Sequence, residues 1–242
     1  MMKMKIEQIP CLSDNYGYLL HDEESGLTAS IDTPDGKVIA ARADELGWTL
    51  THIFNTHHHF DHVGGNAYLK DKYGVTIIGP KADAKRIPGI DQAVSDGETF
   101  TFGNHQVHVF HTPGHTKGHC VYYIPGSNCV FVGDTLFALG CGRLFEGTPA
   151  QMFESLAKLA ALPDTTDVYC AHEYTLSNGA FALTVDPDNV DLQSYMSEAR
   201  TLRNQGLPTV PTTIEREKRA NPFIRAANAK ELGEIRAAKD NF

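Results

Sequence analysis

Short apolar runs rich in β-branched and aromatic residues recur through the first two-thirds of the chain, bounded by glycine, proline, asparagine and aspartate. Such runs predict β-strands. The predicted strands span residues 4–10, 16–22, 27–34, 50–59, 75–80, 98–102, 105–114, 119–125, 129–134 and 167–173. Two pairs of these runs flank Gly103-Asn104 and Gly126-Ser127, and each pair predicts a hairpin.

Segments with helical periodicity separate several of these runs. Residues 37–48 and 63–74 predict helices that end at Gly47 and Gly74, and residues 149–162 place an apolar stripe on one helical face. Strands that alternate with helices are typical of an α/β fold. We therefore expect one α/β domain over residues 1–172.

The pattern changes after about residue 173. Residues 189–206, with Asn189 as N-cap, and residues 229–242 both have helical spacing. Residues 207–223 contain two prolines close together and predict an irregular connection. We expect residues 173–242 to form a small helical domain.

Composition narrows the class of protein. The chain has 242 residues, 41% hydrophobic and 21% charged, which is typical of a soluble globular protein. A net charge of −9 argues against nucleic acid or an anionic membrane as partner. No apolar stretch is long enough to span a membrane, no secretory signal is recognisable, and five cysteines without a CxxC pair favour reduced thiols in the cytoplasm.

The run "THHHFDHVGGN" holds four histidines within residues 57–62. A purification tag would lie at a terminus and carry no aspartate. In an extended segment, alternate side chains point the same way, so His57, His59 and Asp61 can converge, while His62 can turn toward a second point. Imidazole and carboxylate suit zinc, iron or manganese, and four ligands that cannot all reach one ion indicate two metals.

Further ligands are expected at the ends of predicted strands, in "TPGHTKGH" (His115), "VFVGDT" (Asp134) and "YCAHEY" (His172). Singly, each has an ordinary alternative, because an aspartate after a strand is usually a turn former or helix cap. Together with the cluster they supply enough ligands for two metals.

The segments "THHHFDH", "TPGHT", "GDT" and "AHEY" resemble the signature of the metallo-β-lactamase superfamily. The resemblance covers the first 172 residues and implies an αββα sandwich with metals at one edge of its sheets. It implies His57, His59 and His115 at the first metal, Asp61, His62 and His172 at the second, and Asp134 bridging both. His58 and His119 are candidates for contacts behind these ligands, and His105 and His108 are interpreted as structural.

Two adjacent metals lower the pKa of a bound water toward about 7. We expect a bridging hydroxide to attack a carbonyl carbon, with Asp61 and Asp134 as the carboxylates of the catalytic centre and a metal stabilising the oxyanion.

The loop "FALGCGRLFEGTP" and the tail segments "NPFIR" and "IRAAKDNF" resemble those of glyoxalase II, the hydroxyacylglutathione hydrolases. The resemblance implies that glutathione contacts Arg143, Phe145, Tyr174, Arg236 and Lys239. The family often has lysine and tyrosine where this chain has Arg143 and Phe145, which bears on substrate affinity more than on reaction type. For Arg236 and Lys239, three residues apart, the alternative is a solvated helical face.

The implied reaction is hydrolysis of S-D-lactoylglutathione to D-lactate and glutathione, the second step of methylglyoxal detoxification. We expect the enzyme to be a cytoplasmic monomer that holds two divalent metal ions, with zinc as the first candidate and iron or manganese as alternatives. Alternatives on the same fold are a glutathione persulfide dioxygenase, whose relatives typically lack the helical tail, and a lactonase. A nuclease would need a basic surface, which the net charge opposes. A metal-binding protein without turnover is the non-enzymatic alternative.

Overall fold

The computed structural model describes residues 3–242. The chain forms two compact units. The first runs to His111 and takes in Gly118–Phe131, and the second consists of Thr112–Lys117 and Val132–Phe242. This division differs from the boundary at residue 172 expected above, which remains a prediction about domains.

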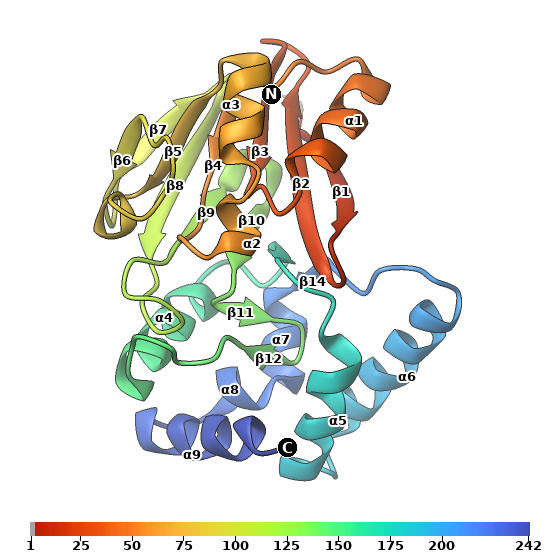
Figure 1. The fold of residues 1–242 in the computed structure, drawn as a ribbon. Helices are drawn as coiled ribbons and strands as arrows, with labels where there is room; N and C mark the ends of the chain where they lie inside the picture. The colour runs from red at the N-terminus through yellow and green to blue at the C-terminus, as the bar shows by residue number, and fades with distance from the viewer. Residues whose placement is uncertain (1–2) are drawn as a thin grey trace. The chain divides into compact units, whose positions relative to one another are not determined.

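The first unit contains a mixed sheet whose strands follow chain order, from β1 to β6 (Figure 1). Its strands are β1 (Lys5–Cys11), β2 (Asn15–Asp22), β3 (Leu27–Ile31), β4 (His52–Phe54), β5 (Thr76–Pro80) and β6 (Gln92–Val94). The pairs from β1 to β3 are antiparallel, and those from β3 to β6 are parallel. The carboxyl ends of β3 and β4 therefore lie at the same edge of the sheet.

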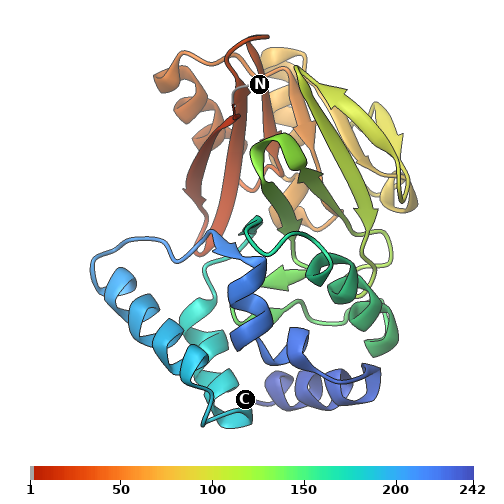
Figure 2. The ribbon, with the colours of Figure 1, turned by 180° about the vertical axis from the view of Figure 1, so that it is seen from behind.

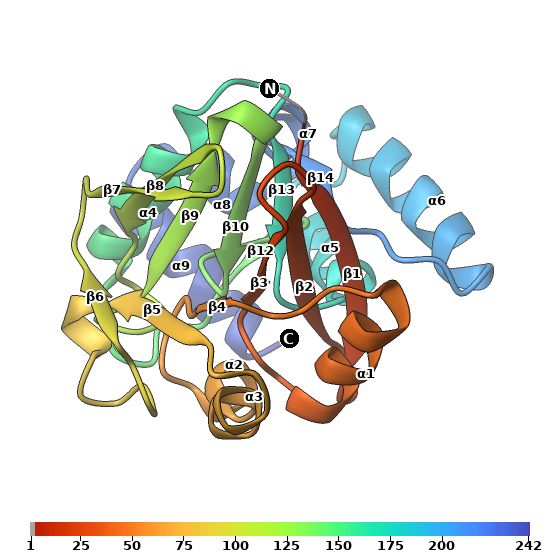
Figure 3. The same ribbon diagram turned by 90° about the horizontal axis from the view of Figure 1, so that it is seen from above.

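Two helices lie in two of the three parallel connections: α1 (Gly36–Leu46) between β3 and β4, and α3 (Asn66–Tyr73) between β4 and β5. The Asp35 carboxylate caps α1 by accepting from the amides of Lys37 and Val38, and α1 ends at Gly47 in the left-handed conformation, with φ 70°. The buried faces of both helices join the core of the sheet (Figure 3). Both predicted helices are confirmed, the second three residues shorter at its start.

A second layer of strands in the first unit is antiparallel. It comprises β7 (Thr99–Phe102), β8 (His105–His111), β9 (Cys120–Ile124) and β10 (Cys129–Gly133), and both predicted hairpins are confirmed. Phe54 of β4 packs edge-on against Phe100 and Phe102, with centroid distances of 5.1 and 5.3 Å. The two sheets thus face each other across an aromatic core. Short 3-10 helices lie at Lys81–Asp83 and Pro125–Ser127.

The second unit is mainly helical. Its strands are β11 (Leu136–Phe137), β12 (Gly140–Cys141), β13 (Asp167–Cys170) and β14 (Thr212–Thr213). Its helices are α4 (Pro149–Ala160), α5 (Thr175–Val185), α6 (Val190–Asn204), α7 (Ile214–Ala220), α8 (Pro222–Arg225) and α9 (Ala229–Asp240). Helices α5 and α6 lie side by side (Figure 2). The predicted helices in 149–162, 189–206 and 229–242 are confirmed.

Two expectations for the C-terminal part were wrong. Residues 207–223, expected to be irregular, contain α7 and the start of α8, and α5 was not predicted. Helix α7 is short, and it is stabilised by the Thr213 cap and by burial of Ile214, Glu217 and Ala220. Helix α5 buries polar as well as apolar residues, so its sequence has little amphipathic periodicity.

Within residues 3–242, the structure contains no helix of the length and apolarity needed to cross a bilayer. All five cysteines are buried and none forms a disulfide.

Candidate metal centre and adjoining cleft

The histidine run begins where β4 ends. His59 still has extended backbone, with φ −60° and ψ 147°, but Phe60–Val63 form a helical turn, α2. The expectation that side-chain alternation continues to Asp61 was therefore wrong. The turn brings His62 back toward the start of the run, and its ring centroid lies 4.0 Å from that of His57.

Asp32 is a functional candidate that the sequence reasoning missed. It follows β3, the parallel neighbour of β4, and its Oδ2 lies 2.8 Å from Nδ1 of His62. The same carboxylate accepts from the Thr56 amide and hydroxyl, both at 2.7 Å. It therefore fixes the orientation of His62 and directs Nε2 away from itself. The available signal was an aspartate placed directly after a buried strand.

The other histidines of this loop have distinct surroundings. His57 Nε2 lies 3.1 Å from His59 Nδ1. The ring of His119 stacks on His57, at a centroid distance of 4.8 Å. His58 is directed elsewhere, with Nδ1 2.8 Å from the buried carboxylate of Asp83. The structure thus places His119 against the ring of a ligand candidate, whereas His58 contacts Asp83 instead.

The second unit brings together the remaining ligand candidates. Asp134 Oδ2 lies 3.4 Å from His115 Nε2, and its Oδ1 lies 3.4 Å from His172 Nε2. Nδ1 of His115 is 2.9 Å from the Arg143 carbonyl oxygen, which orients the ring. His172 stacks on Tyr174 at 4.7 Å, with nearly parallel rings. All three ligand candidates are buried.

These separations suit a metal ion better than hydrogen bonds. Metal–ligand bonds of about 2.0–2.2 Å place tetrahedral ligands about 3.3–3.6 Å apart. The contacts of Asp134 fall in this range, as does the 3.4 Å between His62 Nε2 and Asp61 Oδ2. Ordinary N–H···O bonds are shorter. Imidazole and carboxylate donors without thiolate are also the donor set of catalytic zinc or iron sites.

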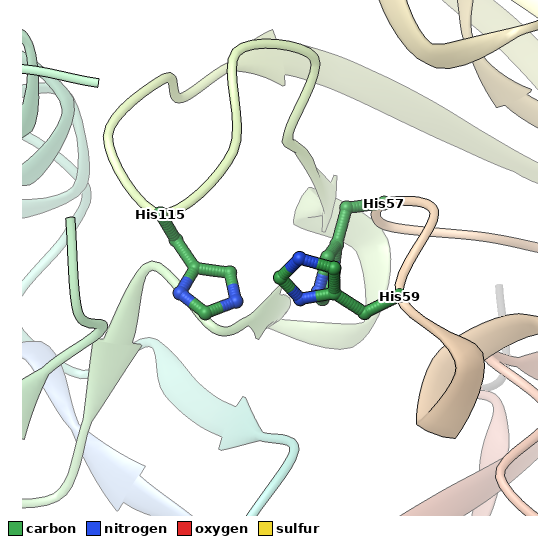
Figure 4. A group of neighbouring side chains, drawn as sticks. All are labelled: His57, His59 and His115. Atoms are coloured by element: carbon green, nitrogen blue, oxygen red, sulfur yellow. The ribbon is translucent and has the colours of Figure 1, made fainter. Parts of the chain in front are cut away.

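Three groups of these side chains have ligand atoms within 4.8 Å of one another. The groups are His57, His59 and His115 (Figure 4); His57, His62 and Asp134; and Asp61, His62 and His172. Each of these groups could hold a divalent metal ion.

A cleft of about 570 Å³ in the second unit is lined by His115 and Asp134. Its volume is typical of small-molecule sites. The five residues predicted to contact substrate all line it as well: Arg143, Phe145, Tyr174, Arg236 and Lys239. The structure thus brings together side chains from the loop after β12, from α9 and from the segment before α5.

Arg236 is built into the wall of the cleft. Its guanidinium donates to the Cys141 carbonyl at 2.8 Å and to Asp240 Oδ1 from both Nε and Nη2. Its side chain is 6% exposed and packs over the Phe223 ring. Arg143 differs, because its side chain is 62% exposed and its Nε lies 3.6 Å from Asp240 Oδ1. The alternative of a solvated helical face is thereby excluded for Arg236.

Lys239 lies between apolar and cationic neighbours. Its ammonium donates to the Ser177 carbonyl at 3.2 Å and lies over the rings of Phe181 and Phe242. Burial, followed by repulsion from Arg236 and Arg143, lowers the pKa of Lys239. An anionic ligand beside this ammonium would therefore stabilise its charged form.

Cys141 has little thiolate character at neutral pH. Burial raises the pKa of its thiol to about 12. This raised pKa does not favour oxidation of the thiol. The Cys141 carbonyl, in contrast, accepts a hydrogen bond from Arg236.

Comparisons with known proteins agree with this geometry. Residues 21–210 match the family described as "Metallo-beta-lactamase superfamily". A protein of Maricaulis maris named hydroxyacylglutathione hydrolase is 55% identical, with all of both chains covered.

Solved structures share the fold. The crystal structure of ETHE1 from Myxococcus xanthus has a TM-score of 0.74 and 28% identity, covering 97% of this chain and 90% of its own. The structure of TTHA1623 in a di-iron-bound form has a TM-score of 0.66 and 25% identity, covering 89% and 98%. The αββα sandwich expected from the sequence is confirmed. The chain belongs to the metallo-β-lactamase superfamily and, within it, to the family of relatives named hydroxyacylglutathione hydrolase.

Proposed function

We propose that this chain hydrolyses thioesters of glutathione with 2-hydroxy acids, S-D-lactoylglutathione among them, and thereby catalyses the second step of methylglyoxal detoxification. The observation that carries the proposal is the cleft, in which two metal-ligand candidates and three cationic side chains line the same cavity. The name of the full-length relative at 55% identity supports the same substrate.

We assign the metal ligands as the resemblance implies: His57, His59 and His115 at one ion, Asp61, His62 and His172 at the other, and Asp134 at both. The ions are divalent, with zinc as the first candidate and iron or manganese as the alternatives. When bound, such ions acidify a coordinated water and stabilise negative charge on a carbonyl oxygen.

The chain's own residues bind and orient the substrate. Glutathione carries two carboxylates, and the chain as a whole has a net charge of −9, so local cations must attract it. Arg143, from the loop after β12, and Lys239, from α9, supply these charges. The exposed ring of Phe145 contacts the ring of His115 edge-on, with centroids 5.3 Å apart, and forms an apolar wall beside the ligands. Tyr174 contributes its hydroxyl as hydrogen-bond donor.

In the overall reaction, water adds across the thioester C–S bond. The hydroxyl joins the acyl carbon, and the proton goes to the glutathione sulfur. Asp134 and His115 line the cleft itself, so an acyl group held beside Phe145 lies next to them. No serine or cysteine nucleophile is required, and the raised pKa of Cys141 makes that thiol unsuited to the role.

The test is loss of the thioester absorbance of S-D-lactoylglutathione, with metal content measured on the same sample. A β-lactam, a lactone and oxygen uptake with glutathione persulfide are assayed in parallel. We expect the thioester to be preferred by several orders of magnitude in kcat/KM. Preference for another substrate, or stoichiometric metal without thioester turnover, would overturn the proposal.

We also propose that the enzyme acts as a monomer in the cytoplasm. Five buried cysteines without a disulfide support a reducing compartment. Light scattering of the purified protein at micromolar concentration checks the oligomeric state.

A further inference from the structure

A carboxylate lies among the cations of the cleft. Asp240 is the last residue of α9 and lines the cleft together with Arg143, Arg236 and Lys239. Its Oδ1 lies 2.8 Å from Arg236 Nη2 and 3.6 Å from Arg143 Nε. The side chain is 40% exposed, so it is within reach of a ligand in the cleft.

Asp240 occupies the place that a ligand carboxylate would take. A carboxylate on a guanidinium forms the same pair whether it belongs to a side chain or to a substrate. Any anionic ligand that approaches Arg143 or Arg236 must compete with Asp240 and is repelled by its charge.

Arg236 has contacts other than Asp240 that hold its guanidinium in the cleft wall. A separate nitrogen, Nη1, donates to the Cys141 carbonyl at 2.8 Å, and the guanidinium packs over the Phe223 ring with 6% of the side chain exposed. Neutralising Asp240 therefore changes the charge of the cleft while the arginine remains in place.

We infer that Asp240 is a specificity-determining residue that weakens binding of glutathione and its thioesters by acting as a built-in competitor for the cleft's cations. The inference rests on the proposed function and adds a residue to it. The physical consequence is faster release of the anionic product, since a tighter cation cluster would retain glutathione.

The test compares Asp240→Asn with the wild-type holoenzyme. Asparagine keeps a carbonyl oxygen that accepts from Arg236 and removes only the charge. Removing one repulsive charge a few ångströms from the ligand lowers KM for S-D-lactoylglutathione and Kd for glutathione about three- to tenfold. The gain shrinks as ionic strength rises, because salt screens an exposed charge.

Two variants serve as controls. Asp240→Glu keeps the charge, so its KM and Kd do not fall as those of Asp240→Asn do. Glu234→Gln makes the same charge change on the same helix, at a side chain that is 67% exposed, pairs with Lys230 and does not line the cleft. It leaves both constants unchanged.

The direction of the change separates the inference from a purely structural role. If Asp240 only positioned Arg236, Asp240→Asn would raise KM. A raised KM, or an unchanged KM and Kd, would overturn the inference. The proposed function would still stand, provided that the wild-type enzyme hydrolyses the thioester. Tighter glutathione binding by Asp240→Asn without turnover by the wild-type enzyme would instead overturn the proposed function and support the inference.

Discussion

At the scale of single residues, two of the ligand candidates are oriented by a hydrogen bond to a second group. Asp32 orients His62, and the Arg143 carbonyl orients His115. A metal site needs this support because a ligand ring that rotates loses both its direction and its tautomer. The same backbone segment that offers Arg143 to the cleft thus also orients a ligand candidate, His115.

Asp134 differs from the other ligand candidates because each of its two carboxylate oxygens lies near a different histidine. Asp134→Ala removes the proposed shared ligand, so we expect metal content and thioester turnover to fall together, turnover by at least about a thousandfold. Elemental analysis and kcat/KM provide the measurements. Asp164→Ala, at an exposed ion pair with Lys218, is the control that retains both. Full metal occupancy in the Asp134 variant would contradict the assignment.

The lowered pKa of Lys239 makes ligand affinity depend on pH. An ordinary lysine titrates near 10.4, whereas Lys239 loses its proton at lower pH because of burial and its arginine neighbours. A bound carboxylate favours the charged form, so affinity is retained at low pH and lost as pH rises through the pKa of Lys239. As the pH is raised, we expect the Kd of S-hexylglutathione to increase at a lower pH for the wild-type enzyme than for Lys239→Arg, because arginine keeps its charge.

Lys239→Ala gives the matching kinetic result, a KM raised about tenfold with metal content intact. Lys230→Ala on the same helix, 87% exposed, is the control. Metal loss in Lys239→Ala would show that this lysine supports the metal centre instead.

At the scale of elements, helices far along the chain hold the β11–β12 hairpin. Glu217 Oε2 accepts from the Leu139 amide at 2.9 Å, and Asn221 donates to the Phe137 and Gly140 carbonyls at 3.2 and 3.0 Å. Leu139 has φ 59°, which a leucine rarely adopts. The hairpin carries Phe137 and Cys141 into the cleft wall, so these buried bonds set the shape of the cleft.

Glu217→Ala leaves the Leu139 amide and the Thr212 hydroxyl without their acceptor in the interior. We expect the free energy of unfolding to fall by about 2–4 kcal/mol and KM to rise as the hairpin loosens. Urea unfolding measures the first effect. Glu215→Ala, on the exposed side of α7, should change stability by less than about 0.5 kcal/mol. An unfolding midpoint for Glu217→Ala equal to the wild-type midpoint would show that the bonds are dispensable.

At the scale of the whole molecule, the ligand candidates come from four segments that are distant in sequence: 57–62, 115, 134 and 172. An unfolded chain cannot present them together, so metal binding stabilises the folded state. A metal concentration one hundred times Kd contributes about 2.7 kcal/mol. Removal of metal by a chelator should lower Tm by roughly 5–10 °C for a chain of this size.

Scanning calorimetry checks this shift, and re-addition of zinc, iron or manganese identifies which ion restores both Tm and turnover. The Asp134→Ala variant should be insensitive to the chelator. Identical Tm values with and without metal in the wild-type enzyme would mean that metal does not bind the native state.

The sequence by itself determined the local elements with strong periodicity, such as the helices that end at Gly47 and Gly74, because hydrophobic spacing and capping act within a few residues. It also determined the ligand candidates, because few kinds of side chain can bind a metal ion. Only the tertiary structure decided that α2 brings His62 toward His57, that Asp32 contacts His62, and that α5 and α7 are helical. These features depend on contacts between distant segments, whose burial overrides weak local preferences.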